Sequence, residues 1–190
     1  MKYRHCIILL LISVAGLFFN VVSAGDTITD NLDSARHCIM SQNYPRALNL
    51  VRMAEERDHG NAEALHLECS IMQTEILDYE SYCINGQHYL LHANSILNRL
   101  KTLLPSMHGG DSLKGLFYLG SIMGGICVVK AKNDNVPIAF TKGLSSIAYF
   151  KQVLSRDSNF IAAYYGLGVF NYYVSQNLYR LPYFNKRYTN

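Results

Sequence analysis

The chain has 190 residues, of which 49% are hydrophobic and 16% are charged, and its formal net charge is +3. This composition is typical of a globular protein and excludes an intrinsically disordered chain. The mild charge also excludes the strongly basic surface of a nucleic-acid-binding protein, so we expect no nucleic-acid partner.

Residues 1–24 have the three-part pattern of a secretory signal peptide. A short basic start (MKYRH) precedes the apolar run CIILLLISVAGLFFNVV, and the small residues Val22 and Ala24 form a cleavage site. We therefore expect cleavage after Ala24 and an exported protein. An uncleaved membrane anchor is the alternative, because the run is close to the shortest length that spans a bilayer.

Cleavage after Ala24 would remove Cys6 and leave four cysteines in the mature chain. These are Cys38, Cys69, Cys83 and Cys127. Their wide spacing, without a CxxC pair, argues against a disulfide-dense miniprotein or a zinc knuckle. Disulfide pairing and burial as small hydrophobic side chains both remain open.

The rest of the chain, 25–190, predicts an all-α domain of about seven helices joined by short turns, with no strand pattern. We expect helices at about 30–42, 45–57, 62–77, 88–104, 112–132 and 138–156, and a seventh that holds FIAAYYGLGVFNYYVS.

Three turns are expected from local signals. In SQNYP, Asn43 suits a left-handed conformation and Pro45 suits the first turn of the second helix. Asn85 and Gly86 predict the turn before the fourth helix. After the turn MHGG, Asp111 is positioned to cap the fifth helix.

The fifth helix has no charged residue between Leu116 and Val129. That stretch is too short to cross a bilayer, so we expect a buried core helix. Its glycines are also compatible with a membrane GxxxG face, but small residues that admit a neighbouring helix in a soluble stack are the preferred interpretation.

The last two predicted helices carry a motif of the tetratricopeptide repeat. Tyr164, Leu167 and Gly168 follow the Trp-x-x-Leu-Gly spacing of its first helix. Ser146 and Phe150 match the second helix of the preceding repeat, and Ser146 lies 18 residues before Tyr164, as that repeat requires. We therefore expect Gly168 to seat a neighbouring helix, with Tyr164 as the large side chain beside it.

A second, shorter match includes Ala47 in QNYPRAL near the N-terminus. From residue 117 onward, LGSIMGGICVVKAK, KGLSSIAYFKQVLSRDSNF and AAYYGLGVFNYYVS together resemble a group of bacterial, signal-peptide-bearing tetratricopeptide-repeat proteins of largely uncharacterised function. The resemblance implies a tetratricopeptide-like α-solenoid over 25–190, in the periplasm or on the envelope, that binds a protein or peptide without catalysis.

Members of this group usually continue with further helices, so we expect this chain to be truncated at its C-terminal end. Two alternatives accompany the binding function. One is an envelope assembly or structural factor with a peripheral outer-membrane association, and the other is a non-functional gene fragment. The sequence does not indicate an oligomeric state.

Tyrosine is enriched at recognition surfaces because it combines apolar area with a polar tip. The candidate partner-binding residues are Tyr44, Tyr79, Tyr82, Tyr89, Tyr172 and Tyr173. Simple packing is the alternative role for these side chains.

No Walker A, GxGxxG, GxSxG or HExxH motif occurs, and we expect no enzyme activity, cofactor or metal. His88 and His92, four residues apart, have the spacing of two metal ligands on a helix, but no third ligand is apparent. His66 and Cys69 have the spacing of a base and a nucleophile, but no orienting acid is apparent.

Overall fold

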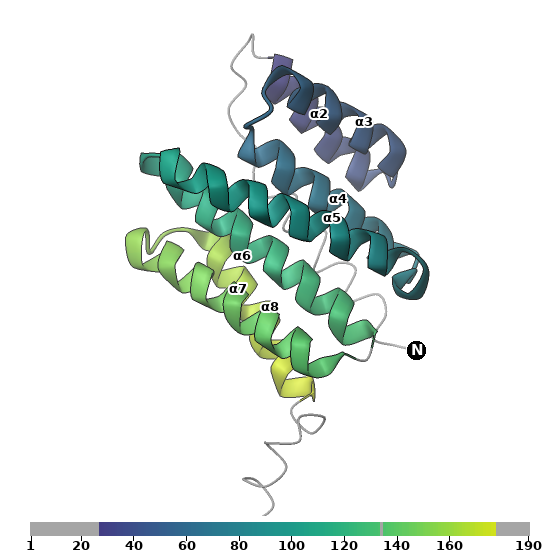
Figure 1. Cartoon of the computed structure of the whole chain (residues 1–190), viewed down its shortest axis with the longest axis vertical. Coiled ribbons are helices and arrows are strands. Elements are labelled where there is room, and N and C mark those ends of the chain that lie inside the picture. Colours follow the sequence, from purple (N-terminus) through teal and green to yellow (C-terminus); the bar gives the residue numbers. More distant parts are fainter. Residues whose placement is uncertain (1–26, 134, 178–190) are drawn as a thin grey trace, which may run out of the picture. The chain divides into compact units, whose positions relative to one another are not determined.

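The computed structural model describes residues 27–133 and 135–177, which form helices joined by short turns, with no strand (Figure 1). The α-helices are α2 (Thr27–Met40), α3 (Tyr44–Arg57), α4 (Ala62–Asp78), α5 (Tyr82–Leu103), α6 (Gly109–Lys132), α7 (Val136–Arg156) and α8 (Ile161–Asn177), and a 3-10 turn spans Leu104–Ser106. The predicted all-α class is therefore confirmed for the described residues. The expected signal peptide at 1–24 lies outside them.

The chain divides into two compact units, Met1–Ser81 and Tyr82–Asn190. In the first unit, α2 packs on α3, α3 packs on α4, and α2 also touches α4. Its core is made of Leu32, Ala35, Ile39, Tyr44, Ala47, Val51, Ala54, Ala64, Leu67 and Ile71. Ala47 is fully buried there, as a small residue between packed helices should be.

The α2–α3 turn is where the sequence predicts it, but the left-handed residue is Gln42 and not Asn43. Asn43 instead caps α3: its side chain accepts a hydrogen bond from the Arg46 amide at 3.3 Å, and Pro45 lies in the first turn. Asn61 caps α4 in the same way through the Ala64 amide. Asparagine in these positions satisfies an amide that the helix leaves unpaired.

The predicted turn at Asn85 and Gly86 is wrong, because both residues lie inside α5. The chain turns earlier, where Glu80 has a positive φ of 49°. Gly86 serves close packing instead: a Cβ placed on it would lie 3.1 Å from the Val129 side chain of α6. The glycine therefore allows α6 to approach α5.

Asp111 does not cap α6, contrary to the expectation from sequence. The helix begins at Gly109 with His108 in the capping position, and Asp111 lies in the first turn. A carboxylate there still interacts favourably with the positive end of the helix dipole.

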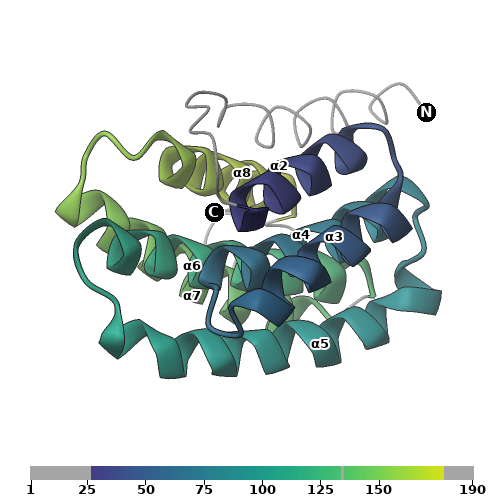
Figure 2. The ribbon, with the colours of Figure 1, turned by 90° about the horizontal axis from the view of Figure 1, so that it is seen from above.

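In the second unit, α6 packs on α5 and α7, and α7 also packs on α8. Figures 1 and 2 both show α6 and α7 side by side. Of the helices in the described ranges, only α6 is long and apolar enough to cross a bilayer, and 61% of its apolar window is buried inside the protein. The burial of most of this window agrees with the expected core helix, but the premise that the stretch is too short to cross a bilayer is wrong, because α6 has 24 residues.

Ser146 and Phe150 of α7 hold that helix against α6. The Ser146 hydroxyl, which is buried, donates a hydrogen bond to the Gly120 carbonyl at 2.7 Å. A Cβ on Gly120 would lie 2.8 Å from the Phe150 ring. A Cβ on Gly124 of α6 would lie 3.3 Å from the Ser146 hydroxyl oxygen. Both side chains therefore use space that glycines leave on α6.

The predicted role of Gly168 as the seat of a neighbouring helix is wrong for the described helices. A Cβ on Gly168 would meet no atom within 4 Å, and Tyr164 is exposed. The seat is Gly166, where a Cβ would lie 2.6 Å from Cζ of Phe150. Because two residues turn a helix by about 200°, α7 covers the opposite side of α8.

A second ring fills a second glycine gap between α7 and α8. A Cβ on Gly143 of α7 would lie 2.8 Å from the Phe170 ring of α8. Leu167 of α8 is half-buried. The idea that large rings occupy glycine gaps therefore holds, although the residues that do so are Phe150 and Phe170.

Candidate functional site

Three of the six candidate tyrosines are buried. Tyr44 donates a hydrogen bond from its hydroxyl to Asp78 inside the first unit. Tyr82 is buried with Lys132 Nζ 5.4 Å from its ring centroid, and Tyr89 is fully buried in α5. Their burial favours packing, which is the alternative role given for these side chains.

The other three tyrosines reach the surface to different degrees. Tyr79, at the end of α4, is exposed, and its ring lies edge-on to the Tyr44 ring with centroids 6.0 Å apart. Tyr172 is exposed and Tyr173 is half-buried on α8. Tyr79 belongs to the first unit, and Tyr172 and Tyr173 belong to the second unit.

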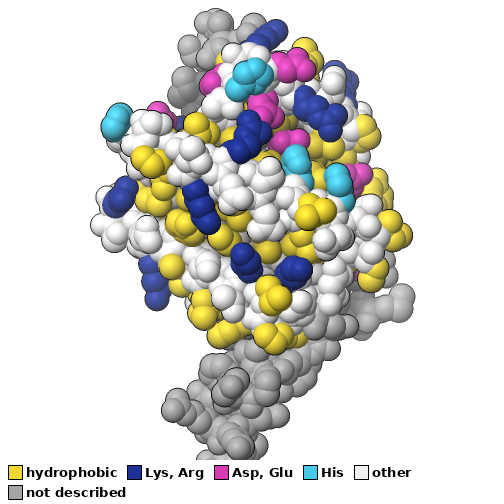
Figure 3. All heavy atoms as spheres, in the orientation of Figure 1, with side chains coloured by type: hydrophobic (Ala, Val, Ile, Leu, Met, Phe, Trp, Pro, Cys, Tyr) yellow, Lys and Arg dark blue, Asp and Glu magenta, His cyan; other side chains and the backbone are white. Residues whose placement is uncertain are grey.

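An exposed apolar stretch on α5 was not expected from the sequence. Ile84 is 82% exposed and Leu91 is 65% exposed, and His88 is exposed between them. These three residues, which we name the α5 stretch, lie at spacings of four and three and therefore share one side of the helix. Figure 3 shows that hydrophobic side chains reach the surface among polar and basic ones on the face in view.

A second exposed surface lies on α8 and is named here the α8 outer face. It consists of Ile161, Tyr164, Gly168 and Tyr172. Ala163, Gly166 and Phe170 lie on the other side of the helix, where α7 packs. Tyr164 and Gly168 of the tetratricopeptide-like motif are therefore exposed, and a Cβ on Gly168 would meet no atom of another described helix within 4 Å.

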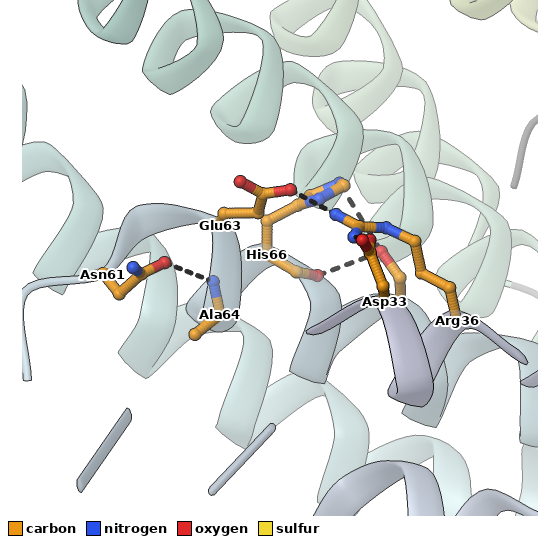
Figure 4. Close-up of polar contacts among 7 residues, drawn as sticks. Asp33, Arg36, Asn61, Glu63, Ala64 and His66 are labelled. Atoms are coloured by element: carbon orange, nitrogen blue, oxygen red, sulfur yellow. Dashed lines mark hydrogen bonds and ion pairs between the residues drawn. The ribbon is translucent and has the colours of Figure 1, made fainter. Parts of the chain in front are cut away.

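A polar cluster connects α2 and α4 in the first unit (Figure 4). Arg36 of α2 forms ion pairs with Asp33 on its own helix and with Glu63 of α4. His66 lies beside this cluster, and its Nε2 is 3.5 Å from the Ser70 hydroxyl. Burial, and then the positive charge of Arg36, lower the pKa of His66 from 6.5 to about 3.

The lowered pKa of His66 makes the stability of the first unit depend on pH. Between pH 6.5 and 3 the unfolded chain binds a proton at His66 that the folded chain does not, so folding is weakened as pH falls through this window. We expect the free energy of unfolding to fall by up to about 1.4 kcal/mol per pH unit from this residue alone. His66→Gln should remove this contribution in urea titrations at several pH values.

The control for this prediction is the dependence of the free energy of unfolding on pH that remains in His66→Gln. That remaining dependence comes from the other titrating groups of the chain, mainly its carboxylates. Glutamine keeps hydrogen-bonding groups but does not titrate. A wild-type slope that equals the variant's slope between about pH 6 and pH 4 would contradict the prediction, because His66 would then titrate normally in the folded protein.

The paired base and nucleophile considered from sequence do not form an activated site. Cys69 is buried, and burial raises the pKa of its thiol far above the ordinary value, so the reactive thiolate is suppressed. The Ser70 hydroxyl donates a hydrogen bond to the His66 carbonyl at 2.9 Å, within the same helix. The geometry therefore supports packing at this part of α4.

The two histidines considered as metal ligands lie together on α5. The His88 and His92 rings are nearly parallel, with centroids 6.4 Å apart. Within the described ranges, no group of three or more His, Cys, Asp or Glu residues is placed to hold a metal ion. The four described cysteines are free thiols; Cys69 is buried, Cys38 and Cys127 are half-buried, and Cys83 is exposed.

Comparisons of this chain with protein-family models, with curated proteins and with solved structures find no match.

Proposed function

We propose that this chain is an exported, non-catalytic protein that binds another protein or peptide through exposed helix faces of a tetratricopeptide-like solenoid. The helix contacts support this architecture. In each unit, consecutive helices pack together, and alternate helices also touch, α2 with α4 and α6 with α8. Such contacts between neighbours and next neighbours are typical of stacked helical hairpins.

The observation that carries the binding function is the α5 stretch. Isolated exposed apolar residues are ordinary on protein surfaces, but Ile84 and Leu91 are large, strongly exposed and two helical turns apart on one side of α5. This arrangement fits a partner segment that presents its own apolar side chains at helical spacing. His88 between them offers a polar contact that would fix the register.

The binding proposal is tested by crosslinking and affinity capture from the envelope fraction. We expect a double substitution of Ile84→Asp and Leu91→Asp to lose a partner that the wild-type protein captures, because two carboxylates would be buried unpaired in the interface. The matched control is Asn98→Asp, which adds a carboxylate at an exposed position two turns beyond Leu91. Equal capture by all three proteins would contradict the proposed surface.

Export is tested separately. Mass spectrometry of the protein purified from its native cell should show a mature chain that begins at Gly25. A chain that retains residues 1–24 would contradict cleavage and would support the membrane-anchor alternative.

A further inference from the structure

The small net charge of the whole chain conceals an uneven distribution of charge between its two units. In the described part of the second unit, the only acidic residues are Asp111 and Asp157. All other acidic residues of the described ranges lie in the first unit. The exposed basic residues of the second unit are Arg99, Lys101, Lys114, Lys132, Lys151 and Arg156. The described part of the second unit is therefore basic.

Positive charge lies at both ends of α5, the helix that carries the α5 stretch. At its first turn, Nζ of the exposed Lys132 lies 5.4 Å from the centroid of the Tyr82 ring, and the Asn133 side chain donates a hydrogen bond to the Tyr82 carbonyl at 3.4 Å. In its last turn, Lys101 is exposed. The whole of α5, Tyr82–Leu103, contains no Asp or Glu. No carboxylate of this helix therefore offsets the two lysines.

The two lysines are also unpaired with the rest of the described chain. Within the described ranges, Lys101 and Lys132 form no ion pair with a carboxylate. Ile84 and Leu91 lie between them along α5, and both are strongly exposed. A ligand that matches this pattern has apolar side chains in its middle and carboxylates at its ends, because each group then meets its complement.

A protein segment fits this pattern better than a nucleic acid or a bilayer. A nucleic acid binds mainly through its phosphate charge and would leave Ile84 and Leu91 exposed to water. Proteins that rest on a bilayer commonly place aromatic residues at its surface, but both tyrosines of α5, Tyr82 and Tyr89, are buried. An amphipathic segment uses both features, since it covers the apolar side chains and brings carboxylates to the lysines.

From the exposed apolar pair and the unpaired lysines at the two ends of α5, we propose that the partner of the α5 stretch is an acidic amphipathic protein segment. Its apolar side chains cover Ile84 and Leu91, and its carboxylates pair with Lys101 and Lys132. This inference rests on the proposed function of the α5 stretch and adds the chemistry of the partner.

A peptide titration of the full chain, followed by fluorescence anisotropy at about 150 mM salt, tests this chemistry. The probe is a synthetic helical peptide of about 20 residues, the length of α5, with leucines at spacings of three and four and glutamates at both ends. A matched peptide has lysines in place of the glutamates. The acidic peptide should bind at least about tenfold more tightly than the basic one, because only its charges complement those of α5.

Substitution of the two lysines tests their part in this binding. Lys101→Gln combined with Lys132→Gln should raise the Kd of the acidic peptide by about fivefold or more. Lys142→Gln combined with Lys151→Gln removes the same charge from α7 and should change the Kd by less than about twofold. The two pairs differ because salt at this concentration screens charges beyond about 8 Å.

Equal binding of the two peptides, or equal effects of the two lysine pairs, would overturn the acidic partner. Tighter binding to phosphatidylglycerol vesicles than to the acidic peptide would also overturn it, in favour of a lipid surface. Self-association that Lys101→Gln with Lys132→Gln abolishes would overturn it in favour of the acidic first unit of a second copy.

Failure of this inference is distinguishable from failure of the proposed function. If only the acidic chemistry is wrong, Ile84→Asp with Leu91→Asp still abolishes capture of the native partner, while the substitution of Lys101 and Lys132 leaves that capture unchanged. If the proposed function is wrong, the aspartate pair leaves the capture unchanged as well.

Discussion

Replacing Phe150 with alanine is expected to lower the free energy of unfolding of the second unit by about 3–5 kcal/mol, the range found for a buried phenylalanine. The Phe150 ring is buried and fills gaps at two glycines, Gly120 of α6 and Gly166 of α8. It also lies against the Phe117 ring, with centroids 5.8 Å apart. One truncation therefore removes a side chain that three helices share.

The matched control for Phe150→Ala is Ile138→Ala on the same helix, where the side chain is exposed. Its cost should stay within about 1 kcal/mol, because little apolar area returns to water. Urea denaturation monitored by circular dichroism measures both variants. A similar loss in the two proteins would contradict a central role for Phe150.

Gly166→Ala has the second largest expected effect, a loss of about 1–3 kcal/mol in the free energy of unfolding, which is the usual cost of overpacking a core. Alanine has the higher helix propensity, and in an open position it would stabilise α8. At Gly166, however, the added methyl group would lie 2.6 Å from Cζ of Phe150. The clash outweighs the gain in propensity, so the sign of the effect is unfavourable.

Gly168→Ala is the control for that prediction, two residues along the same helix. No atom of the described residues lies within 4 Å of its added Cβ, so the single chain should gain about 0.5–1 kcal/mol from propensity alone. If Gly166→Ala stabilised the chain as much as Gly168→Ala, the assignment of the packed face of α8 would be wrong.

Helix positions could be predicted from the sequence where local signals fix them. Asn43 and Pro45 mark the start of α3, Arg57 ends it, and the structure agrees with these bounds. The turn at Asn85 and Gly86 failed because a local signal for a turn was in fact a packing requirement. Gly86 is a glycine because Val129 approaches it from a distant part of the chain, and no neighbouring residue in the sequence reports that contact.

The choice between Gly166 and Gly168 shows the same limit. Both glycines lie in one helix, and a repeat motif favoured the second. Which of them meets a ring depends on the rotation of α8 about its own axis, which is set by how Phe170 fits against Gly143. A tertiary contact of this kind cannot be read from the spacing within α8.

The burial of one candidate tyrosine could have been predicted from its spacing within a helix. Tyr89 is three residues after Gly86 and four before Ala93, and all three are buried on one side of α5. This spacing, read with the helix boundaries now known, assigns Tyr89 to the core and leaves Ile84 and Leu91 on the surface. Tyr44 differs, because its contacts are distant in sequence: its ring lies in a core shared by three helices, and its hydroxyl donates a hydrogen bond to Asp78, 34 residues away.

The most direct test of this account is a double-mutant cycle that combines Phe150→Leu with Gly166→Ala. Leucine lacks the Cζ atom that the methyl group added by Gly166→Ala would meet, so the cost of Gly166→Ala should fall sharply in the Phe150→Leu protein. We predict a coupling free energy of about 1 kcal/mol or more between the two sites. Additive effects would show that Phe150 does not fill the gap at Gly166, and they would contradict the packing that turns the other face of α8 outward.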